Sequence, residues 1–350
     1  MSRIQEARDV FKSIHHAWEQ DKQTVLLMIT EVRGSAYRQP GAKMMMATGA
    51  DMFGTLSGGC LESDLWGWAE KVMEEQSPRL QQYDLSENEL WSLGIGCKGA
   101  LEILLAPVEK SDPFWTKMND MIQAEQPVSL IMEIPSGIRV LLDKDGAGWG
   151  DADRLPEGVR QRVMSGSGHR TRAEVVSIGS RRFVIDTMRP SERLIIAGAG
   201  HDAVPLVNIA AQVGFNVSVL DSREEYNNIR RFPSATHITL QPSDADPSQF
   251  HDGWWIIMNH HQARDEESLA LALKSRPRFI GVLGPLSRTK EMLAKIGSGL
   301  NSGPLHAPVG FDLGSETIEE VAVSIISQLM AVRNGRQSAL PLHGREKIHS

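Results

Sequence analysis

The stretch RLIIAGAGHDAVPLVNIAAQVGFNVSVLDSREEY, residues 193–226, decides the fold of the C-terminal part of the chain. A short apolar run is followed by a glycine turn, a helix-like segment and a second apolar run, the order of a β-α-β unit with parallel strands. Residues 198–203 read GAGHDA, a G-x-G-x-x-A turn in which Gly198 and Gly200 allow a tight bend and the close approach of a phosphate. We therefore predict a Rossmann-like, doubly wound parallel sheet over residues 191–340.

The same region carries polar side chains where such sheets bind ligands, at the carboxyl ends of the strands. The helix that begins after His201 would offer free N–H groups to an anion. Asp221 ends the second apolar run, 23 positions after Gly198, where an acidic residue can meet a ribose hydroxyl. The other polar groups expected at this edge are the run Asn259-His260-His261 with Asp265, the pair Arg288 and Lys290, and Asp312 with Gly314, Ser315 and Glu316.

These edge residues have simpler interpretations as well. Paired histidines at a strand end are often hydrogen-bonded loop residues, and Arg288 and Lys290 could be solvated helix charges. Asp312 and Glu316 could serve only the dipole of the helix that follows them. Their common position at strand ends of one sheet favours the functional interpretation.

The rest of the chain predicts a different organisation. Residues 1–110 combine an amphipathic helix over 3–20, a buried strand from Thr24, a short hairpin and a helix over 61–75, which together indicate an α+β domain. Residues 111–190 alternate between helical and strand patterns, and we expect them to complete the first domain or to link it to the second. The expected fold class is α/β, with an N-terminal α+β domain before the parallel sheet.

Each of the two cysteines of the chain lies in a glycine-rich loop. Cys60 follows Gly58 and Gly59 in GTLSGGCLES, and Cys97 lies in GIGCKGA. With Ser57 as helix N-cap, Cys60 would occupy the first turn of a helix, where the dipole and unpaired N–H groups favour a thiolate. A thiolate can act as nucleophile, metal ligand or sulfur acceptor. The alternative is a small buried core residue.

Composition excludes several classes of protein. The 350 residues carry a formal net charge of −7, which argues against a nucleic-acid binder. We expect no membrane span, because no apolar run approaches the roughly 18 residues it needs. The N-terminal sequence lacks the apolar core of a signal peptide, and two cysteines cannot form a disulfide framework, so we expect a cytoplasmic protein.

Several longer motifs resemble the XdhC/CoxI family. EVRGSAYRQPGAKMMM, GTLSGGCLESDL and LGIGCKGALEILLAP are similar to its N-terminal domain, and LIIAGAGHDAVPL, VSVLDSREEY, IGVLGPLSRTK and PVGFDLGSETIEEVAVSI to its C-terminal Rossmann domain. The resemblance covers about residues 10–107 and 190–335. The chain departs from the family pattern at residues 202–205, DAVP, where a small residue and often a glycine are usual, and at residues 259–261, NHH, where the family usually has Thr-His-Asp.

The resemblance implies a maturation factor for molybdenum hydroxylases such as xanthine dehydrogenase, not itself catalytic. Such proteins bind molybdenum cofactor, as molybdopterin or its dinucleotide form, work with a cysteine desulfurase while the sulfido ligand is installed, and pass the cofactor to the apo-enzyme. A homodimer is also implied. Carried onto this sequence, Cys60 and Cys97 match the family's cysteine motifs, Gly198 and Gly200 its Rossmann turn, and Asp221 and Arg223 its D-x-R motif. With the strand-end groups above, we expect cofactor contacts from among Gly58, Gly59, Cys60, Cys97, Gly198, Gly200, His201, Asp221, Arg223, His260 and Asp312. We expect Cys60 to contact the molybdenum.

Two other functions remain open at this stage. The glycine turn would suit an NAD(P)-dependent oxidoreductase in which His260 or His261 acts as acid or base. The chain could also be an accessory component of a xanthine dehydrogenase complex in purine catabolism. It lacks the cysteine cluster that iron–sulfur centres require, so it is not the electron-transfer part of such a complex.

Overall fold

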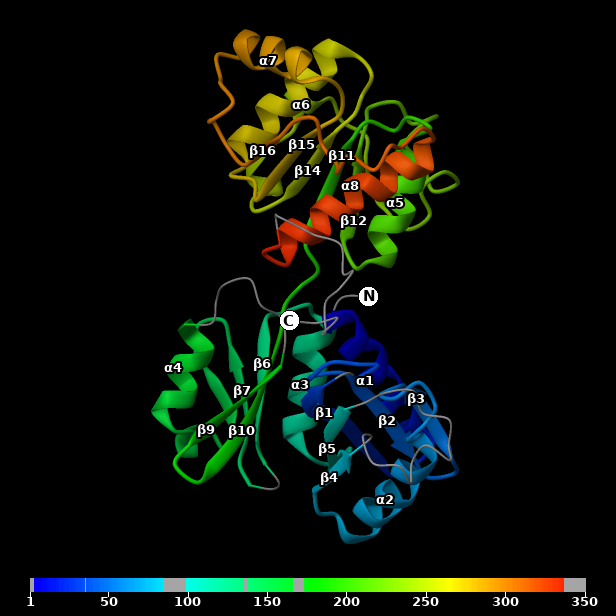
Figure 1. Cartoon of the computed structure of the whole chain (residues 1–350), viewed down its shortest axis with the longest axis vertical. Helices are drawn as coiled ribbons and strands as arrows, with labels where there is room; N and C mark the ends of the chain where they lie inside the picture. Colours follow the sequence, from blue (N-terminus) through cyan, green and yellow to red (C-terminus); the bar gives the residue numbers. More distant parts are fainter. Residues whose placement is uncertain (1–2, 35, 85–98, 135–136, 166–172, 337–350) are drawn as a thin grey trace. The chain divides into compact units, whose positions relative to one another are not determined.

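The computed structural model describes residues 3–34, 36–84, 99–134, 137–165 and 173–336. These residues form two compact units, one over 3–190 and one over 191–336. Both units combine helices and strands, and we describe each by itself (Figure 1). Within the described ranges, no helix combines the length and the apolar character needed to cross a membrane.

The N-terminal unit contains a first antiparallel sheet in the order β3-β2-β1-β5-β4. Its central strand is buried along most of its length because helices cover both faces. Leu26 and Met28 point to the face packed with α1 and α3, whereas Val25 and Leu27 point to the face packed with α2. The strands are β1 (Thr24–Gly34), β2 (Lys43–Ala47), β3 (Asp51–Gly54), β4 (Arg79–Asp84) and β5 (Gly99–Pro107), and the helices are α1 (Arg3–Glu19), α2 (Glu62–Glu75) and α3 (Pro113–Gln123).

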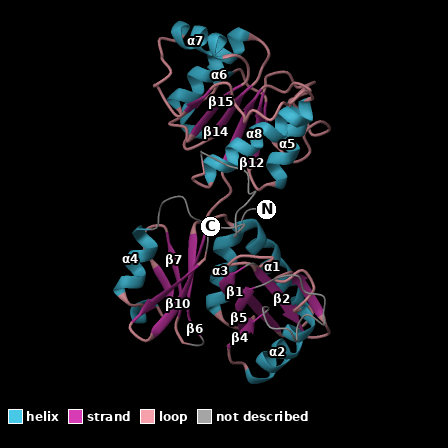
Figure 2. Ribbon diagram, viewed as in Figure 1, coloured by secondary structure: helices cyan, strands magenta, loops and turns pink. Residues whose placement is uncertain are grey.

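Residues 111–190 supply a second antiparallel sheet to this same unit, in the order β8-β7-β6-β10-β9. One face shares a single hydrophobic core with α1, α3 and the first sheet, and the other face packs against α4. Figure 2 shows the two groups of strands with their helices. The elements are β6 (Val128–Ile134), β7 (Arg139–Asp143), β8 (Gly148–Gly150), α4 (Glu157–Ser165), β9 (Glu174–Ile178) and β10 (Arg181–Met188).

The two sheets are also joined by charged side chains. Lys43 on β2 forms an ion pair with Asp186 on β10, and both side chains are at most 1% exposed. The Lys43 ammonium donates a second hydrogen bond to the carbonyl of Gly41, at 3.0 Å. Arg182 on β10 pairs with the buried Glu102 on β5, at 2.8 Å. A buried charge is costly unless it is paired. These contacts therefore hold β10 of the second sheet against β2 and β5 of the first.

The C-terminal unit is a six-stranded parallel sheet in the order β13-β12-β11-β14-β15-β16. This is the strand order of the doubly wound dinucleotide-binding fold, so the predicted fold class is confirmed. Helices α5 and α8 cover one face, and α6 and α7 the other. The elements are β11 (Arg193–Ala197), α5 (Ala203–Gln212), β12 (Asn216–Leu220), β13 (Thr236–Ile238), β14 (Trp254–Ile257), α6 (Gln262–Lys274), β15 (Phe279–Val282), α7 (Leu286–Lys295), β16 (Leu305–His306) and α8 (Ile318–Arg333).

The buried Lys43–Asp186 pair yields a stability prediction. Lys43→Met should lower the free energy of unfolding of the N-terminal unit by about 3–5 kcal/mol, because it leaves the Asp186 carboxylate buried without its counter-charge. Lys43→Met combined with Asp186→Leu should recover most of this loss, since an apolar pair of similar volume needs no counter-charge. Urea denaturation followed by tryptophan fluorescence measures both variants.

The control for this prediction is Arg162→Ala, which breaks the exposed Arg162–Glu174 pair of the same unit. We expect its unfolding midpoint to stay near that of the wild type. A double variant as unstable as Lys43→Met alone would contradict the role given to the ion pair.

Candidate functional site

The glycine turn after β11 is squeezed between the ends of neighbouring strands. Gly198 has φ +118°, and a Cβ atom there would lie 2.6 Å from the carbonyl oxygen of Met258. The Gly198 N–H donates to the carbonyl of Leu220 at the end of β12, at 3.0 Å. Only glycine combines this backbone angle with this close approach. The turn is therefore rigid and lies at the carboxyl edge of the sheet, as predicted.

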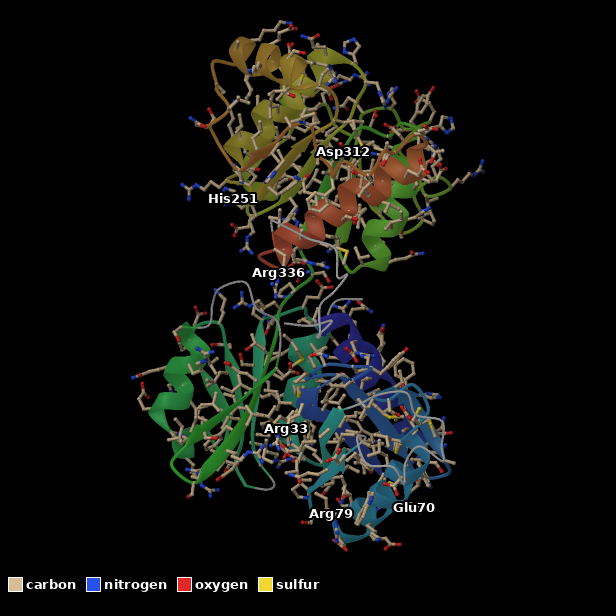
Figure 3. The ribbon with its side chains drawn as sticks, viewed as in Figure 1. Arg33, Glu70, Arg79, His251, Asp312 and Arg336 are labelled. Carbon is tan, nitrogen blue, oxygen red and sulfur yellow. The ribbon has the colours of Figure 1, made fainter. Side chains whose placement is uncertain are left out.

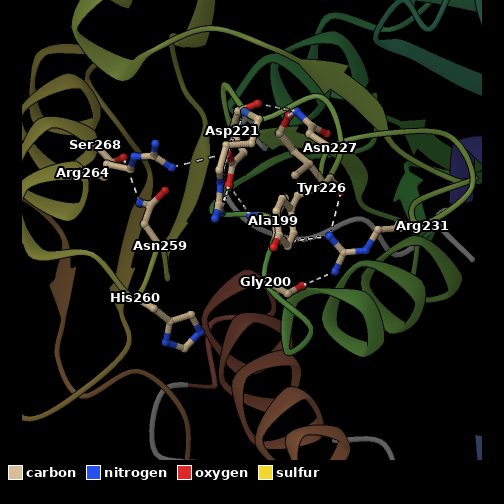
Figure 4. Close-up of polar contacts among 12 residues, drawn as sticks. Ala199, Gly200, Asp221, Tyr226, Asn227, Arg231, Asn259, His260, Arg264 and Ser268 are labelled. Carbon is tan, nitrogen blue, oxygen red and sulfur yellow. Dashed lines mark hydrogen bonds and ion pairs between the residues drawn. The ribbon is translucent and has the colours of Figure 1, made fainter.

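The buried Asp221 carboxylate hydrogen-bonds to the backbone of this glycine turn (Figure 4). Its side chain is 1% exposed, and one carboxylate oxygen accepts the backbone N–H of Ala199 at 2.9 Å and the Arg223 guanidinium at 2.6 Å. The other oxygen accepts the backbone N–H and Nε of Arg223, at 3.0 and 2.9 Å. Burial alone would raise the pKa of Asp221, but the hydrogen bonds from Arg223 and Ala199 outweigh it and lower that pKa. Both oxygens expected to be available to a ribose are thus engaged within the protein.

Arg231 is a second support of the turn that the sequence did not indicate. Its guanidinium donates to the carbonyls of Ala199 at 2.7 Å and Gly200 at 3.1 Å. The ring of Tyr226 lies beside two guanidinium groups, with Arg223 at 4.5 Å and Arg231 at 5.3 Å from its centroid (Figure 4). No spacing rule marks these residues, since they come from the irregular segment between β12 and β13.

The residue after Met258 belongs to an internal network. The backbone N–H and the side-chain amide of Asn259 each donate to the Asp265 carboxylate at 2.9 Å. Asp265 is 1% exposed and also pairs with Arg288 at the start of α7. Arg288 therefore fixes the ends of β14 and α7 rather than facing solvent as a free cation, whereas Lys290 is exposed on α7.

His260 does reach the glycine turn. Its backbone has φ +58°, its side chain is 62% exposed, and its Nε2 lies 2.7 Å from a carboxylate oxygen of Asp202. Asp202 directly precedes α5, so the pair sits where the helix N-terminus would meet an anion. His201, between Gly200 and Asp202, is exposed. The topology thus brings His260 from β14 to the turn after β11, as the sequence predicted.

Asp312 lies in the C-terminal unit, on the segment before α8 (Figure 3). Its carboxylate accepts the backbone N–H of Gly314 at 3.4 Å, and its side chain is exposed. The capping box between Thr317 and Glu320, which the sequence predicted, is present at the start of α8. Asp312 therefore stays a prediction as a ligand-binding residue.

The Cys60 loop of the N-terminal unit is built around Glu62. The expected N-cap at Ser57 was wrong, because α2 begins at Glu62 after Leu61, and no side chain caps it. Cys60 lies two residues before the helix and is exposed. The Glu62 carboxylate accepts hydrogen bonds from the backbone N–H groups of Leu56, Ser57, Gly59 and Leu61, at 2.9–3.2 Å, and from the hydroxyls of Thr55 and Ser57.

These contacts change the expected chemistry of the loop. Burial alone would raise the pKa of Glu62, but the hydrogen bonds from Ser57 and Thr55 outweigh it and hold the pKa at about 2. The N–H donors that were expected to stabilise a Cys60 thiolate are engaged by this carboxylate. A carboxylate just after a glycine-rich loop, at the first position of a helix, was the available signal for Glu62.

The metal-binding capacity of the described residues is limited. No group of three or more His, Cys, Asp or Glu side chains among them could hold a metal ion. Cys60 would therefore contribute a single soft ligand to a metal centre. Cys97 lies outside the described residues.

The geometry around Asp221 predicts a pH-dependent stability. Asp221→Asn should lower the free energy of unfolding of the C-terminal unit by about 1–3 kcal/mol at neutral pH, because an amide cannot replace the carboxylate as acceptor for Arg223. The folded-state pKa of Asp221 is lowered, so its contribution is complete above the pKa of the unfolded chain and is lost as the pH falls through the folded-state value. The difference between variant and wild type should therefore shrink below about pH 4.

Denaturant titrations from pH 7 to pH 3 measure this difference. The control is Asp252→Asn, which alters an exposed carboxylate at φ +57° that asparagine also tolerates. A difference between Asp221→Asn and wild type that stays constant over this pH range would contradict the role of the Asp221 carboxylate.

Comparisons with known proteins agree with this architecture. Residues 17–84 match the model of the XdhC and CoxI family, and residues 194–329 match that of the XdhC Rossmann domain. A probable xanthine dehydrogenase subunit of Bacillus subtilis is 31% identical over 90% of this chain and 94% of its own length. The molybdenum cofactor insertion chaperone PaoD of Escherichia coli is 23% identical over 93% of this chain and 88% of its own length.

A solved structure also matches the whole chain. The crystal structure of a xanthine dehydrogenase from Bacillus halodurans is 30% identical, with a TM-score of 0.76, and the match covers 98% of this chain and 99% of that one. Each of these relatives therefore matches both the N-terminal and the C-terminal part of the chain. By these matches, the chain belongs to the XdhC and CoxI family.

Proposed function

We propose that this chain is an accessory protein in the maturation of a molybdenum hydroxylase of the xanthine dehydrogenase type. It binds molybdenum cofactor as cargo, holds it while the sulfido ligand is installed, and passes it to the apo-enzyme. It is not itself the catalyst. The names of two relatives, a probable xanthine dehydrogenase subunit and a cofactor insertion chaperone, support this role.

The observation that carries the proposal is the exposed Cys60 thiol on a loop fixed by Glu62. A thiolate is a soft ligand and suits a metal centre that is already bound by sulfur. Because the thiol is exposed, a cargo can bind to it and can later be released to the apo-enzyme. We assign contact with the molybdenum to Cys60.

We assign recognition of the phosphate-bearing part of the cargo to the carboxyl edge of the C-terminal sheet. The N-terminus of α5 offers N–H groups there, and His201 and His260 are exposed beside it. Asp202 occupies part of this position, and a phosphate would have to compete with it for His260. We propose molybdopterin or its dinucleotide form as the cargo.

The partners follow from this role. We propose a cysteine desulfurase as the source of sulfur and a xanthine dehydrogenase-type apo-enzyme as the recipient, with this chain acting as a homodimer in the cytoplasm. An alternative is a permanent component of the hydroxylase, which the name of the Bacillus subtilis relative favours. Co-purification at constant stoichiometry through size-exclusion chromatography would favour the permanent component, and loss of the chain from the active enzyme would favour the chaperone.

A nicotinamide-dependent oxidoreductase is the less favoured alternative. In dinucleotide-binding folds the acidic residue after the second strand hydrogen-bonds the ribose. Here both carboxylate oxygens of Asp221 are engaged by Ala199 and Arg223. A nicotinamide dinucleotide would therefore have to break these hydrogen bonds before its ribose could be recognised.

The first prediction from this proposal concerns Cys60. Cys60→Ala and Cys60→Ser, purified from a molybdenum-replete host, should retain about tenfold less molybdenum and pterin than the wild type, a loss of about 1.4 kcal/mol or more in binding. Metal analysis by mass spectrometry and fluorescence of the oxidised pterin measure both components. The folded state should be unaffected, because the thiol is exposed.

Ser63→Ala is the matched control, because Ser63 is exposed on the first turn of the same helix. It should retain cofactor as the wild type does. Equal retention by the Cys60 variants and the wild type would remove Cys60 from the binding site.

The second prediction concerns nicotinamide cofactors. Titration with NADH, followed by its fluorescence, should give no saturable binding below about 1 mM, since the Asp221 carboxylate is occupied. NADPH is the parallel probe. Micromolar affinity for either, with hydride transfer to an added acceptor, would favour the oxidoreductase over the chaperone.

A further inference from the structure

The loop that carries Cys60 is anchored at both ends by buried leucines, and the conformation of its middle depends on the Glu62 side chain. Leu56 and Leu61 are buried in the core beneath α2, at 0% and 2% exposure. Between them, Gly58 and Gly59 have φ +76° and +105°, and a Cβ atom at Gly59 would meet nothing within 4 Å. A Cβ atom at Gly58 would lie 3.6 Å from the ring of Tyr37. Two successive glycines leave this backbone many alternatives. Packing therefore fixes where the loop begins and ends but not the path between.

The Glu62 carboxylate supplies the missing constraint. One oxygen accepts the N–H groups of Gly59 and Leu61, at 2.9 and 3.2 Å, which flank Cys60 on both sides. The other oxygen accepts the N–H groups of Leu56 and Ser57, at 3.2 and 3.1 Å. The loop thus surrounds a single buried anion, the Glu62 carboxylate. Cys60 lies between the two residues, Gly59 and Leu61, whose N–H groups donate to the same oxygen of that carboxylate.

The hydroxyl groups of the loop complete this arrangement. Thr55 donates to Glu62 at 2.8 Å and accepts the N–H of Gly58 at 3.0 Å. Ser57 donates to Glu62 and accepts the N–H of Leu61 at 2.8 Å. Thr55 thus extends the constraint to Gly58, whereas Ser57 shares the Leu61 N–H with the carboxylate. The carboxylate and both hydroxyls therefore act as one unit.

We propose that Glu62 is the positioning residue for Cys60, and that it fixes the direction in which the thiol meets the cargo. Its action goes through Cys60 and not through direct contact with the cargo, because its carboxylate is buried under the loop. The role in cargo binding rests on the proposed function, whereas the ordering of the loop does not.

A purely structural role is the alternative to exclude. A carboxylate in the first turn of a helix stabilises it through the helix dipole, and aspartate does so as well as glutamate. Glu62→Asp keeps that charge but withdraws the acceptor by about 1.5 Å, one C–C bond, which breaks the contacts to the loop. If Glu62 serves only the helix, Glu62→Asp should behave as the wild type.

The first measurement needs no cargo. Hydrogen exchange resolved to peptides covering residues 55–62 should be about tenfold faster or more in Glu62→Ala, Glu62→Gln and Glu62→Asp than in the wild type. Glu74→Gln, an exposed carboxylate later on the same helix, is the matched control and should leave this exchange unchanged. Unchanged exchange in the Glu62 variants would overturn the ordering of the loop by Glu62.

The second measurement is a double-mutant cycle on cofactor retention by the full chain. Glu62→Asp should lose about tenfold in molybdenum and pterin content, measured at a temperature at which both the variant and the wild type are fully folded. In a Cys60→Ala background, Glu62→Asp should cause no further loss, because a positioning residue has nothing left to position. Independent, additive losses would overturn the proposal and assign Glu62 a role that does not involve Cys60.

The two measurements separate the possible failures. If the wild type retains no molybdenum or pterin, the proposed function falls, while the exchange experiment still decides whether Glu62 orders the loop. If the wild type retains both and Glu62→Asp retains them equally, the proposed function stands and the positioning role falls.

Discussion

A buried carboxylate must be surrounded by hydrogen-bond donors, and this requirement shapes each functional region of the protein. Asp186 takes the Lys43 ammonium and so joins the two antiparallel sheets. Asp221 takes donors from the glycine turn and from Arg223. Glu62 takes donors from the loop that precedes α2, and Cys60 lies on that loop. At Asp221 and Glu62, the backbone of the candidate site itself donates hydrogen bonds to the buried anion. Loss of the anion would free the backbone without removing the site residue itself.

This constraint also explains which features the sequence could predict. The β-α-β order and the spacing of strand ends predicted the parallel sheet and the meeting of His260 with the glycine turn, because topology alone brings strand ends together. The direction of a carboxylate is not set by topology. Asp221 turns inward because Arg223 and Ala199 supply donors there. The helix begins at Glu62 after Leu61 and not after Ser57, and the Glu62 carboxylate turns back to accept the N–H groups of the loop. Residues 111–190 were ambiguous because alternation predicts a strand but not the sheet that it joins.

The two compact units carry different chemistry. The N-terminal unit presents an exposed soft nucleophile on an ordered loop, and the C-terminal unit presents the N-terminus of α5 with exposed histidines at a sheet edge. Each group by itself suits one chemical feature of a cargo that carries a sulfur-bound metal and a phosphate. Two relatives of the chain are named as a probable xanthine dehydrogenase subunit and a molybdenum cofactor insertion chaperone, which supports the proposed role.

The proposed role depends most on contact between Cys60 and the molybdenum of the bound cofactor. X-ray absorption at the molybdenum K-edge tests it most directly, on the loaded full-length protein and on loaded Cys60→Ser reconstituted at saturating cofactor. The account predicts an additional sulfur neighbour of molybdenum in the wild type, which is absent from the Cys60→Ser spectrum. Identical sulfur coordination in the two spectra would contradict it, and Cys60 would then contribute to the loop alone.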